Sequence, residues 1–263
     1  MIVRDDGEGL IIIRQGDHAT LTADIAKAWH PPGKPRARPT SSLLIAATHH
    51  DVGWRAWEDS TPDPLDEAGR PRDFLHMRLD DHLAIWRDSI DQTARYDLYA
   101  GVLVSMHACA LYELRLTTVP DPEADRSRIR AFIEQQAVWR SQARTLLAGR
   151  PYYAPHLSEK GLATNLKLLQ VWDFLSLMLC VPWTGSHTFE EVRLPDGGHH
   201  TLTASATGDG TLSLEPYPLH AEPFPLSVEG RRLAQQRFAR PADLAQAYTT
   251  APTVRLKFAV RAA

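Results

Sequence analysis

Apolar residues recur every three or four positions through most of the first 185 residues, which is the spacing of one face of an α-helix. A short β-branched run from Leu10 to Arg14 comes first and predicts a strand. The segment 98–116 is apolar on nearly all sides, so we expect its helix to be buried. The periodic segments predict helices at about 17–29, 40–53, 79–95, 98–116, 123–148 and 159–181.

The pattern changes after residue 185. Glycine-rich turns at 196–198 and 208–210 separate short stretches in which apolar and polar residues alternate, as in half-buried strands. Further strands are expected at 227–238 and 253–260, with a short helix near 241–249 between them. The C-terminal part is therefore predicted to be rich in β-structure.

These patterns together predict a mainly α fold. We expect an all-alpha core over residues 1–185 and a small β-rich segment over 186–263 that packs on it. Two proline-containing stretches, 31–39 and 58–75, are interpreted as loops of the core. Gly53 is well placed to end the second helix.

Composition and charge narrow the function classes. The formal net charge is −3 with both signs interspersed, which argues against a nucleic-acid partner. The two cysteines, Cys109 and Cys180, lie in apolar helical contexts and favour a reducing compartment without disulfides. Acidic residues near Met1 are unlike a secretory signal, and the apolar runs are too short to span a bilayer. We therefore expect a cytoplasmic protein with no membrane partner, and a homo-oligomer is possible.

Several ionisable residues interrupt apolar helical patterns. The pair His50-Asp51 closes the apolar run of the second helix, and His107 and Asp173 lie within apolar helix faces. His18 stands at the entry to the first helix. A carboxylate is costly to bury unless it is paired, hydrogen-bonded or bound to metal. Either these side chains are core residues whose polar atoms are hydrogen-bonded within the protein, or they hold one or two divalent transition-metal ions. A donor set that mixes nitrogen and oxygen allows Fe, Mn, Co or Zn.

Two choices among histidines stay open. His49 and His50 are adjacent, and neighbours on a helix diverge by about 100°, so only one is expected to bind. We favour His50 because it directly precedes Asp51. His82 opens a predicted helix, and His76 is its rival for a further ligand position.

The order of these residues resembles the HD-domain superfamily, whose signature is a His, a His-Asp pair and a distant Asp. The resemblance implies an all-helical fold and, in members that bind two metals, two further His between the pair and the last Asp. Its members include phosphohydrolases and di-iron oxygenases related to myo-inositol oxygenase. It implies metal ligands at His18, His50, Asp51, His82 (or His76), His107 and Asp173.

A closer resemblance is to a bacterial family known only as a domain of unknown function. The segments 14–19, 50–54, 103–107 and 173–177 carry it. It covers nearly the whole chain, including the β-rich tail, and implies no activity.

The leading hypothesis is a metal-dependent hydrolase that cleaves a phosphoester of a small anionic molecule. Asp51 is expected to be catalytic, and Trp54 and Arg55, its neighbours, are expected to contact the substrate. The alternatives are a di-iron oxygenase of the myo-inositol oxygenase type and a non-catalytic binding or sensor protein with a degenerate metal site.

Two further groups of charged or polar residues are most simply interpreted as solvent-exposed loops. Lys34, Arg36 and Arg38 could meet an anionic substrate, but a solvated basic loop is the simpler explanation. His199-His200 follows a glycine turn and is expected to be an exposed loop pair.

Overall fold

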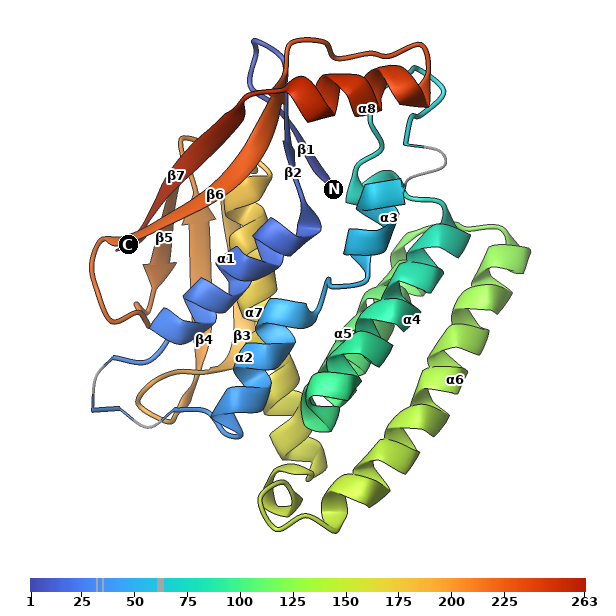
Figure 1. The fold of residues 1–263 in the computed structure, drawn as a ribbon. Coiled ribbons are helices and arrows are strands. Elements are labelled where there is room, and N and C mark those ends of the chain that lie inside the picture. The colour runs from blue at the N-terminus through green and yellow to red at the C-terminus, as the bar shows by residue number, and fades with distance from the viewer. Residues whose placement is uncertain (32, 35, 61–63) are drawn as a thin grey trace.

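A mixed seven-stranded sheet covers one side of the molecule in the computed structural model, which describes residues 1–31, 33–34, 36–60 and 64–263 (Figure 1). The strand order is β1-β2-β6-β7-β5-β4-β3, and all neighbours are antiparallel except β5 and β7. The strands are β1 (Ile2–Asp5), β2 (Leu10–Ile13), β3 (Gly185–Arg193), β4 (His199–Ala206), β5 (Thr211–Glu215), β6 (Phe224–Leu233) and β7 (Thr253–Ala262).

The helices form layers that start at the sheet. Helices α1 and α7 contact both the sheet and each other, and α2 packs on them. Helix α5 contacts α2, α4 and α7, and α6 packs on its outer side (Figure 1). The helices are α1 (Gln15–Ala28), α2 (Thr40–His49), α3 (Trp54–Ser60), α4 (Leu79–Tyr96), α5 (Leu98–Thr118), α6 (Glu123–Ala148), α7 (Glu159–Cys180) and α8 (Pro241–Thr250).

Capping residues fix where the two central helices begin. The Asp97 carboxylate accepts a hydrogen bond from the Ala100 amide at the start of α5, at 2.8 Å. The Ser158 hydroxyl accepts one from the Gly161 amide at the start of α7, at 3.1 Å. Each bond satisfies a donor that has no partner within its helix. These caps set the register in which α5 and α7 present their inner faces.

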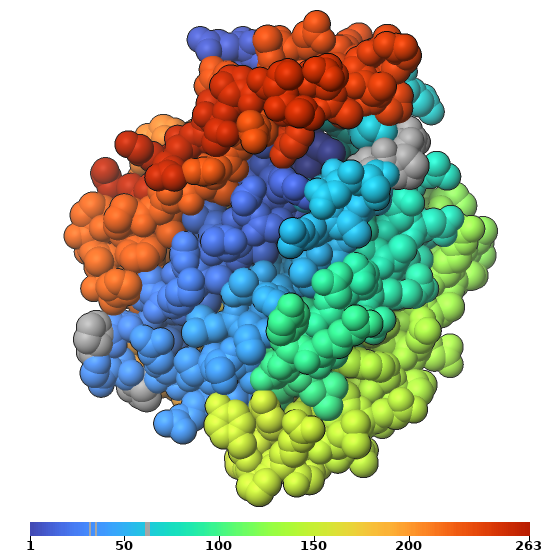
Figure 2. Space-filling model, in the orientation of Figure 1, coloured from blue at the N-terminus to red at the C-terminus, as the bar shows by residue number. Residues whose placement is uncertain are grey.

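The core spans both the helices and the sheet. Trp29, which follows α1 directly, and Trp172 of α7 meet edge to face, with ring centroids 6.0 Å apart, and both are buried. A smaller apolar cluster joins the two ends of the chain, with Leu10 and Leu233 packed against Leu244 of α8. Figure 2 shows the red C-terminal segment beside the dark-blue N-terminal strands. Among the described residues, no helix is both long enough and apolar enough to cross a membrane.

The prediction of a mainly α fold with an all-alpha, HD-like core is wrong. Strands β1 and β2 precede the helices, and β2 pairs with β6 through Leu10 and Leu233. The fold is therefore α/β, with one sheet built from both ends of the chain. The pairing of β2 with β6 leaves no local signal in the sequence, because the two strands lie at opposite ends of the chain. The sequence therefore does not predict that the N-terminal strands join the C-terminal sheet.

The individual elements follow the sequence more closely. All six long predicted helices are confirmed within a few residues, as are the predicted strand at β2 and the short helix α8. The sequence does not predict strand β1 or helix α3. Gly53 does not end the second helix: α2 ends at His49, and Gly53 is the last residue of the turn before α3. The loops predicted at 31–39 and 58–75 include positions 32, 35 and 61–63, which lie outside the described residues.

Gly53 is required by close packing. A Cβ there would lie 2.2 Å from the Ile85 carbonyl oxygen and 2.7 Å from the Ser89 amide nitrogen of α4. Gly53→Ala is therefore expected to lower the free energy of unfolding by about 1–3 kcal/mol, the usual range for overpacking. Gly16→Ala is the control, since its Cβ would meet no atom within 4 Å. Urea denaturation measures both; equal stability of the two variants would contradict the packing argument.

Candidate functional site

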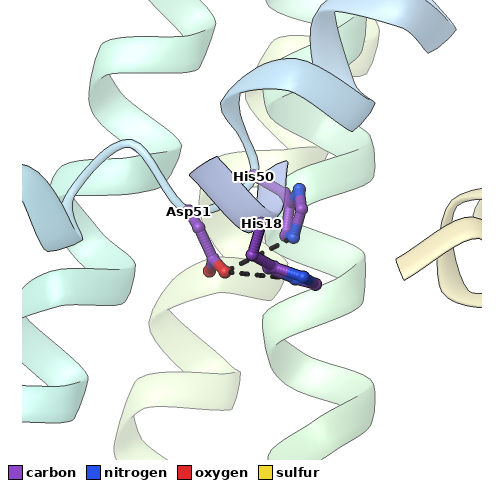
Figure 3. Close-up of side chains that lie close together, drawn as sticks. All are labelled: His18, His50 and Asp51. Carbon is purple, nitrogen blue, oxygen red and sulfur yellow. Dashed lines mark ion pairs between the residues drawn. The ribbon is translucent and has the colours of Figure 1, made fainter. Parts of the chain in front are cut away.

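Five buried ionisable residues converge between the helices from four parts of the chain. His18 comes from α1, His107 from α5 and Asp173 from α7, while His50 and Asp51 lie in the turn after α2. Figure 3 shows the His18 and His50 imidazoles and the Asp51 carboxylate pointing toward one another. We refer to His18, His50, Asp51, His107 and Asp173 as the His-Asp cluster.

The polar atoms of the cluster are close together. His18 Nε2 lies 2.8 Å from Asp173 Oδ1 and 3.8 Å from Asp51 Oδ2. His50 Nε2 lies 3.2 Å from Asp173 Oδ1 and 3.4 Å from Asp51 Oδ2. Ligand atoms about 2.0–2.2 Å from one ion lie about 3.0 Å apart at the corners of an octahedron and about 3.4 Å apart at those of a tetrahedron. The four contacts scatter around these separations. The ligand atoms of His18, His50 and Asp51 all lie within 4.8 Å of one another, so these three residues have the size of a single-ion site. Asp173 Oδ1 lies beside His18 and His50.

Hydrogen bonds hold two imidazoles in one orientation. His50 Nδ1 donates to the Ala47 carbonyl at 3.0 Å. His18 Nδ1 is 2.8 Å from Ser176 Oγ, whose own hydroxyl donates to the Asp173 carbonyl, so Nδ1 is the donor. Both Nε2 atoms therefore face the carboxylates. His50 Nε2 has no aligned hydrogen-bond partner among the described residues although it is fully buried, as expected of a nitrogen whose partner is an ion.

His107 contacts the other oxygen of Asp173. Its Nε2 lies 3.4 Å from Asp173 Oδ2, whereas His18 and His50 face Oδ1. Its Nδ1 is buried and has no partner among the residues that the structure describes. His107 thus orients the Asp173 carboxylate and keeps one nitrogen free.

Burial and the neighbouring charges have opposite effects on the pKa values of His50 and Asp173. Burial alone would lower the pKa of His50, but the Asp51 and Asp173 carboxylates raise it to about 9. Burial alone would raise the pKa of Asp173, but the His50 charge and the contacts with His107 and His18 hold it well below its usual range. Two buried carboxylates thus require positive charge, which a proton on His50 supplies in the metal-free protein.

This coupling makes the stability of the metal-free protein depend on pH. Because the pKa of His50 rises from 6.5 to about 9 on folding, its stabilising contribution is complete below pH 6.5 and is lost as pH rises through 9. The free energy of unfolding, measured by urea denaturation with chelator present, should therefore fall over that interval. His50→Gln should abolish the fall, and the exposed control His76→Gln should keep it; a fall that persists in His50→Gln would refute this origin.

The structure places the other predicted histidines outside the cluster. His82 Nε2 accepts a hydrogen bond from Trp86 Nε1 at 3.1 Å, and its Nδ1 lies 3.1 Å from the Tyr112 hydroxyl. Burial and the Arg115 charge lower the pKa of His82 to about 4, so the ring is neutral. His76 is exposed and pairs with Asp73. His49 packs edge-on against Tyr96, so His50 is the member of the adjacent pair that joins the cluster.

A cavity of about 220 Å³ opens onto the cluster. Trp54 lines it, whereas Arg55 is exposed and is not part of its wall. The cation at this wall is instead Arg115, whose guanidinium binds the Asp121 carboxylate at 2.7 and 2.8 Å. Arg115 follows His107 by two helical steps of four residues, so the i, i+4 pattern of α5 could have identified it. The apolar wall is formed by Trp54, Phe74, Leu75, Met77, Trp86, Leu111 and Leu177.

Comparison with known proteins gives one result. No curated protein and no solved structure matches the chain. A family model, described as Protein of unknown function (DUF3891), matches residues 1–235. This confirms the predicted resemblance to a family of unknown function and does not show the resemblance to the HD-domain superfamily. The chain therefore belongs to the family described as Protein of unknown function (DUF3891).

Proposed function

We propose that the His-Asp cluster binds one divalent transition-metal ion and that the protein is a metal-dependent hydrolase of a small molecule. His18, His50, Asp51 and Asp173 would be the ligands. The observation that carries this proposal is the buried His50 Nε2, which has no aligned hydrogen-bond partner among the described residues. It faces two carboxylates at distances that suit ligands of a common ion.

A single ion is favoured over two. A second ion would draw on His107, on Asp173 Oδ2 and on a further histidine. His82 is the nearest candidate in the same cavity, but both of its ring nitrogens are engaged by Trp86 and Tyr112. Binding through His82 would require at least one of these buried hydrogen bonds to break, which is unfavourable.

The residues around the ion have separable roles. A divalent transition metal here would lower the pKa of a coordinated water and so supply a nucleophile near neutral pH. Asp51 Oδ2 faces the imidazoles, and its Oδ1 makes no hydrogen bond with another described residue, so Oδ1 would be available as a proton acceptor. His107 Nδ1 is also buried and has no hydrogen-bond partner among the described residues. Arg115 also lines the cavity, but its guanidinium is paired with the Asp121 carboxylate.

The cavity limits the substrate. Its volume of about 220 Å³ is below the roughly 300–1,000 Å³ of typical ligand pockets, which favours a molecule smaller than a nucleotide. The aromatic walls favour a substrate with an apolar body. Phosphoester hydrolysis is the first reaction to test, because a divalent ion can bind a phosphoryl oxygen as well as a water.

Small aryl phosphates provide the assay, with protein loaded with Mn, Fe, Co or Zn. Leu111 lies on the cavity wall, and Leu114 is exposed on the same helix without lining it. Leu111→Trp should fill the cavity and reduce turnover at least about tenfold with metal content unchanged, while Leu114→Trp should keep both. Metal binding without turnover of any ester would overturn the hydrolase proposal and leave a binding protein.

Oxidation is the second candidate, because one subset of the cluster favours it. His18, His50 and Asp51 form a two-histidine, one-carboxylate set whose ligand atoms lie within 4.8 Å of one another. Such a set is used by non-haem iron oxygenases. Oxygen consumption that requires Fe(II) and substrate, without turnover under anaerobic conditions, would favour this candidate over hydrolysis.

Ser176 provides a test of ligand orientation. Its hydroxyl accepts from His18 Nδ1 and donates to the Asp173 carbonyl, so it links two proposed ligands. Ser176→Ala should weaken metal binding about 10–100-fold, as loss of such supporting hydrogen bonds usually does. Competition with a fluorescent chelator measures the affinity. Ser186→Ala, an exposed control, should not change it; unchanged affinity in Ser176→Ala would exclude a positioning role.

A further inference from the structure

A second cavity lies at the N-terminal end of α7, apart from the His-Asp cluster. Its volume is about 430 Å³. Asn165, on its wall, and Asp173 are eight residues apart on α7, which corresponds to about 12 Å along the helix. Its polar wall is formed chiefly by Arg38, His156, Lys160, Thr164, Arg193 and His199.

The charge of this cavity is unbalanced. Arg38, Lys160 and Arg193 line it, and no aspartate or glutamate is part of its described wall. Within the described part of the chain, none of these three side chains forms an ion pair, whereas Arg14 and Arg115, for example, each bind a carboxylate. Three uncompensated cations around one concavity repel one another and attract anions.

The backbone behind these cations is fixed. Asn165 is buried and donates from its Nδ2 to the Arg38 carbonyl at 2.9 Å and to the Tyr99 hydroxyl at 2.8 Å. The Arg193 carbonyl accepts from Trp29 Nε1 at 3.3 Å. The main chain that presents Arg38 and Arg193 is therefore held by the core, while their side chains stay available to a ligand.

Neutral donors complete the wall. Ser158 caps α7 through Gly161, and the positive end of this long helix adds to the field of the cations. Thr164 contributes a hydroxyl, 3.5 Å from His199 Nε2. Burial and the Arg38 charge lower the pKa of His156, so this ring is neutral at pH 7 and can hydrogen-bond without adding charge.

We propose that this cavity binds a small, polar, phosphorylated molecule, with its phosphate held by Arg38, Lys160 and Arg193. Guanidinium and ammonium groups with nearby hydroxyls are the groups that bind phosphate in proteins. The cavity is larger than a phosphate ion, and its side walls are polar rather than aromatic. The remaining space thus suits a hydroxylated body. The proposal is independent of the metal site and of the reaction proposed there.

Calorimetric titration at about 0.15 M ionic strength tests the proposal. The probes are glucose 6-phosphate, glucose and inorganic phosphate, added to the full chain. Glucose 6-phosphate should bind saturably and at least about tenfold more tightly than glucose or inorganic phosphate. Equal binding of all three, or no saturable binding of the ester, would overturn the proposal.

Charge-removing variants locate the site. Lys160→Gln combined with Arg193→Gln should weaken binding of glucose 6-phosphate at least about tenfold. Lys34→Gln is the matched control, because Lys34 is exposed near Arg38 in the sequence but does not line the cavity. Thermal unfolding midpoints should be similar in all three proteins. Equal affinity of the double variant and the control would contradict the assignment.

Discussion

Replacing Asp173 with alanine is expected to remove metal binding and to destabilise the metal-free fold by about 3–5 kcal/mol, the usual effect of breaking a buried ion pair. Asp173 contacts His18, His50 and His107, and it is buried among apolar residues of α7. Without it, Asp51 is the one carboxylate among the described residues that still pairs with His50. Urea denaturation in the presence of chelator measures the change.

An exposed ion pair provides the control for this variant. Asp24 binds Lys27 at 2.9 Å at the surface of α1, so Asp24→Ala should change the free energy of unfolding by less than about 1 kcal/mol. If the two substitutions changed the free energy of unfolding by similar amounts, Asp173 would stabilise the fold no more than a surface charge does.

Asp51→Asn is expected to abolish turnover and to weaken metal binding by a factor of about 100 or more, since loss of a supporting residue alone weakens it about 10–100-fold. The substitution keeps the shape of the side chain, so the fold should survive. The carboxylate oxygen Asp51 Oδ2 faces both His18 and His50. A neutral amide oxygen at this place would be a weaker ligand because it carries no negative charge.

Metal affinity and turnover must be measured on the same preparation of this variant. Asp59→Asn is the control, because Asp59 is exposed and pairs only with Arg14 among the described residues. Full metal occupancy with normal turnover in Asp51→Asn would contradict the role of Asp51. Lost turnover with intact metal binding would instead limit Asp51 to proton transfer.

The sequence predicted the helices well and the architecture poorly. Helical periodicity is local, so α5 and α7 could be placed within a few residues of their true ends. The sheet depends on pairing between β2 and β6, which are more than two hundred residues apart in the chain. Nothing in the four residues of β1 or β2 indicates that partner, and the fold class was wrong for this reason.

The sequence indicates the His-Asp cluster because polar, ionisable residues occur at positions where the apolar pattern predicts burial. His18, His50, Asp51, His107 and Asp173 stood out because apolar helices surround them, and the structure brings these five together. His82 was also singled out, but its two hydrogen bonds with aromatic side chains depend on helix packing that the sequence does not show. Only its proximity in sequence to Asp51 suggests Arg55 as a substrate contact, and Arg55 is not part of the cavity wall.

Anomalous X-ray diffraction from crystals of protein purified without chelator tests the metal site most directly. Data collected above and below the absorption edge of the metal found by elemental analysis identify and locate the ion. We predict one ion about 2.0–2.2 Å from His18 Nε2, His50 Nε2 and the Asp51 and Asp173 carboxylates. A protein that stays metal-free in the presence of Mn, Fe, Co and Zn, or an ion bound elsewhere, would contradict the account.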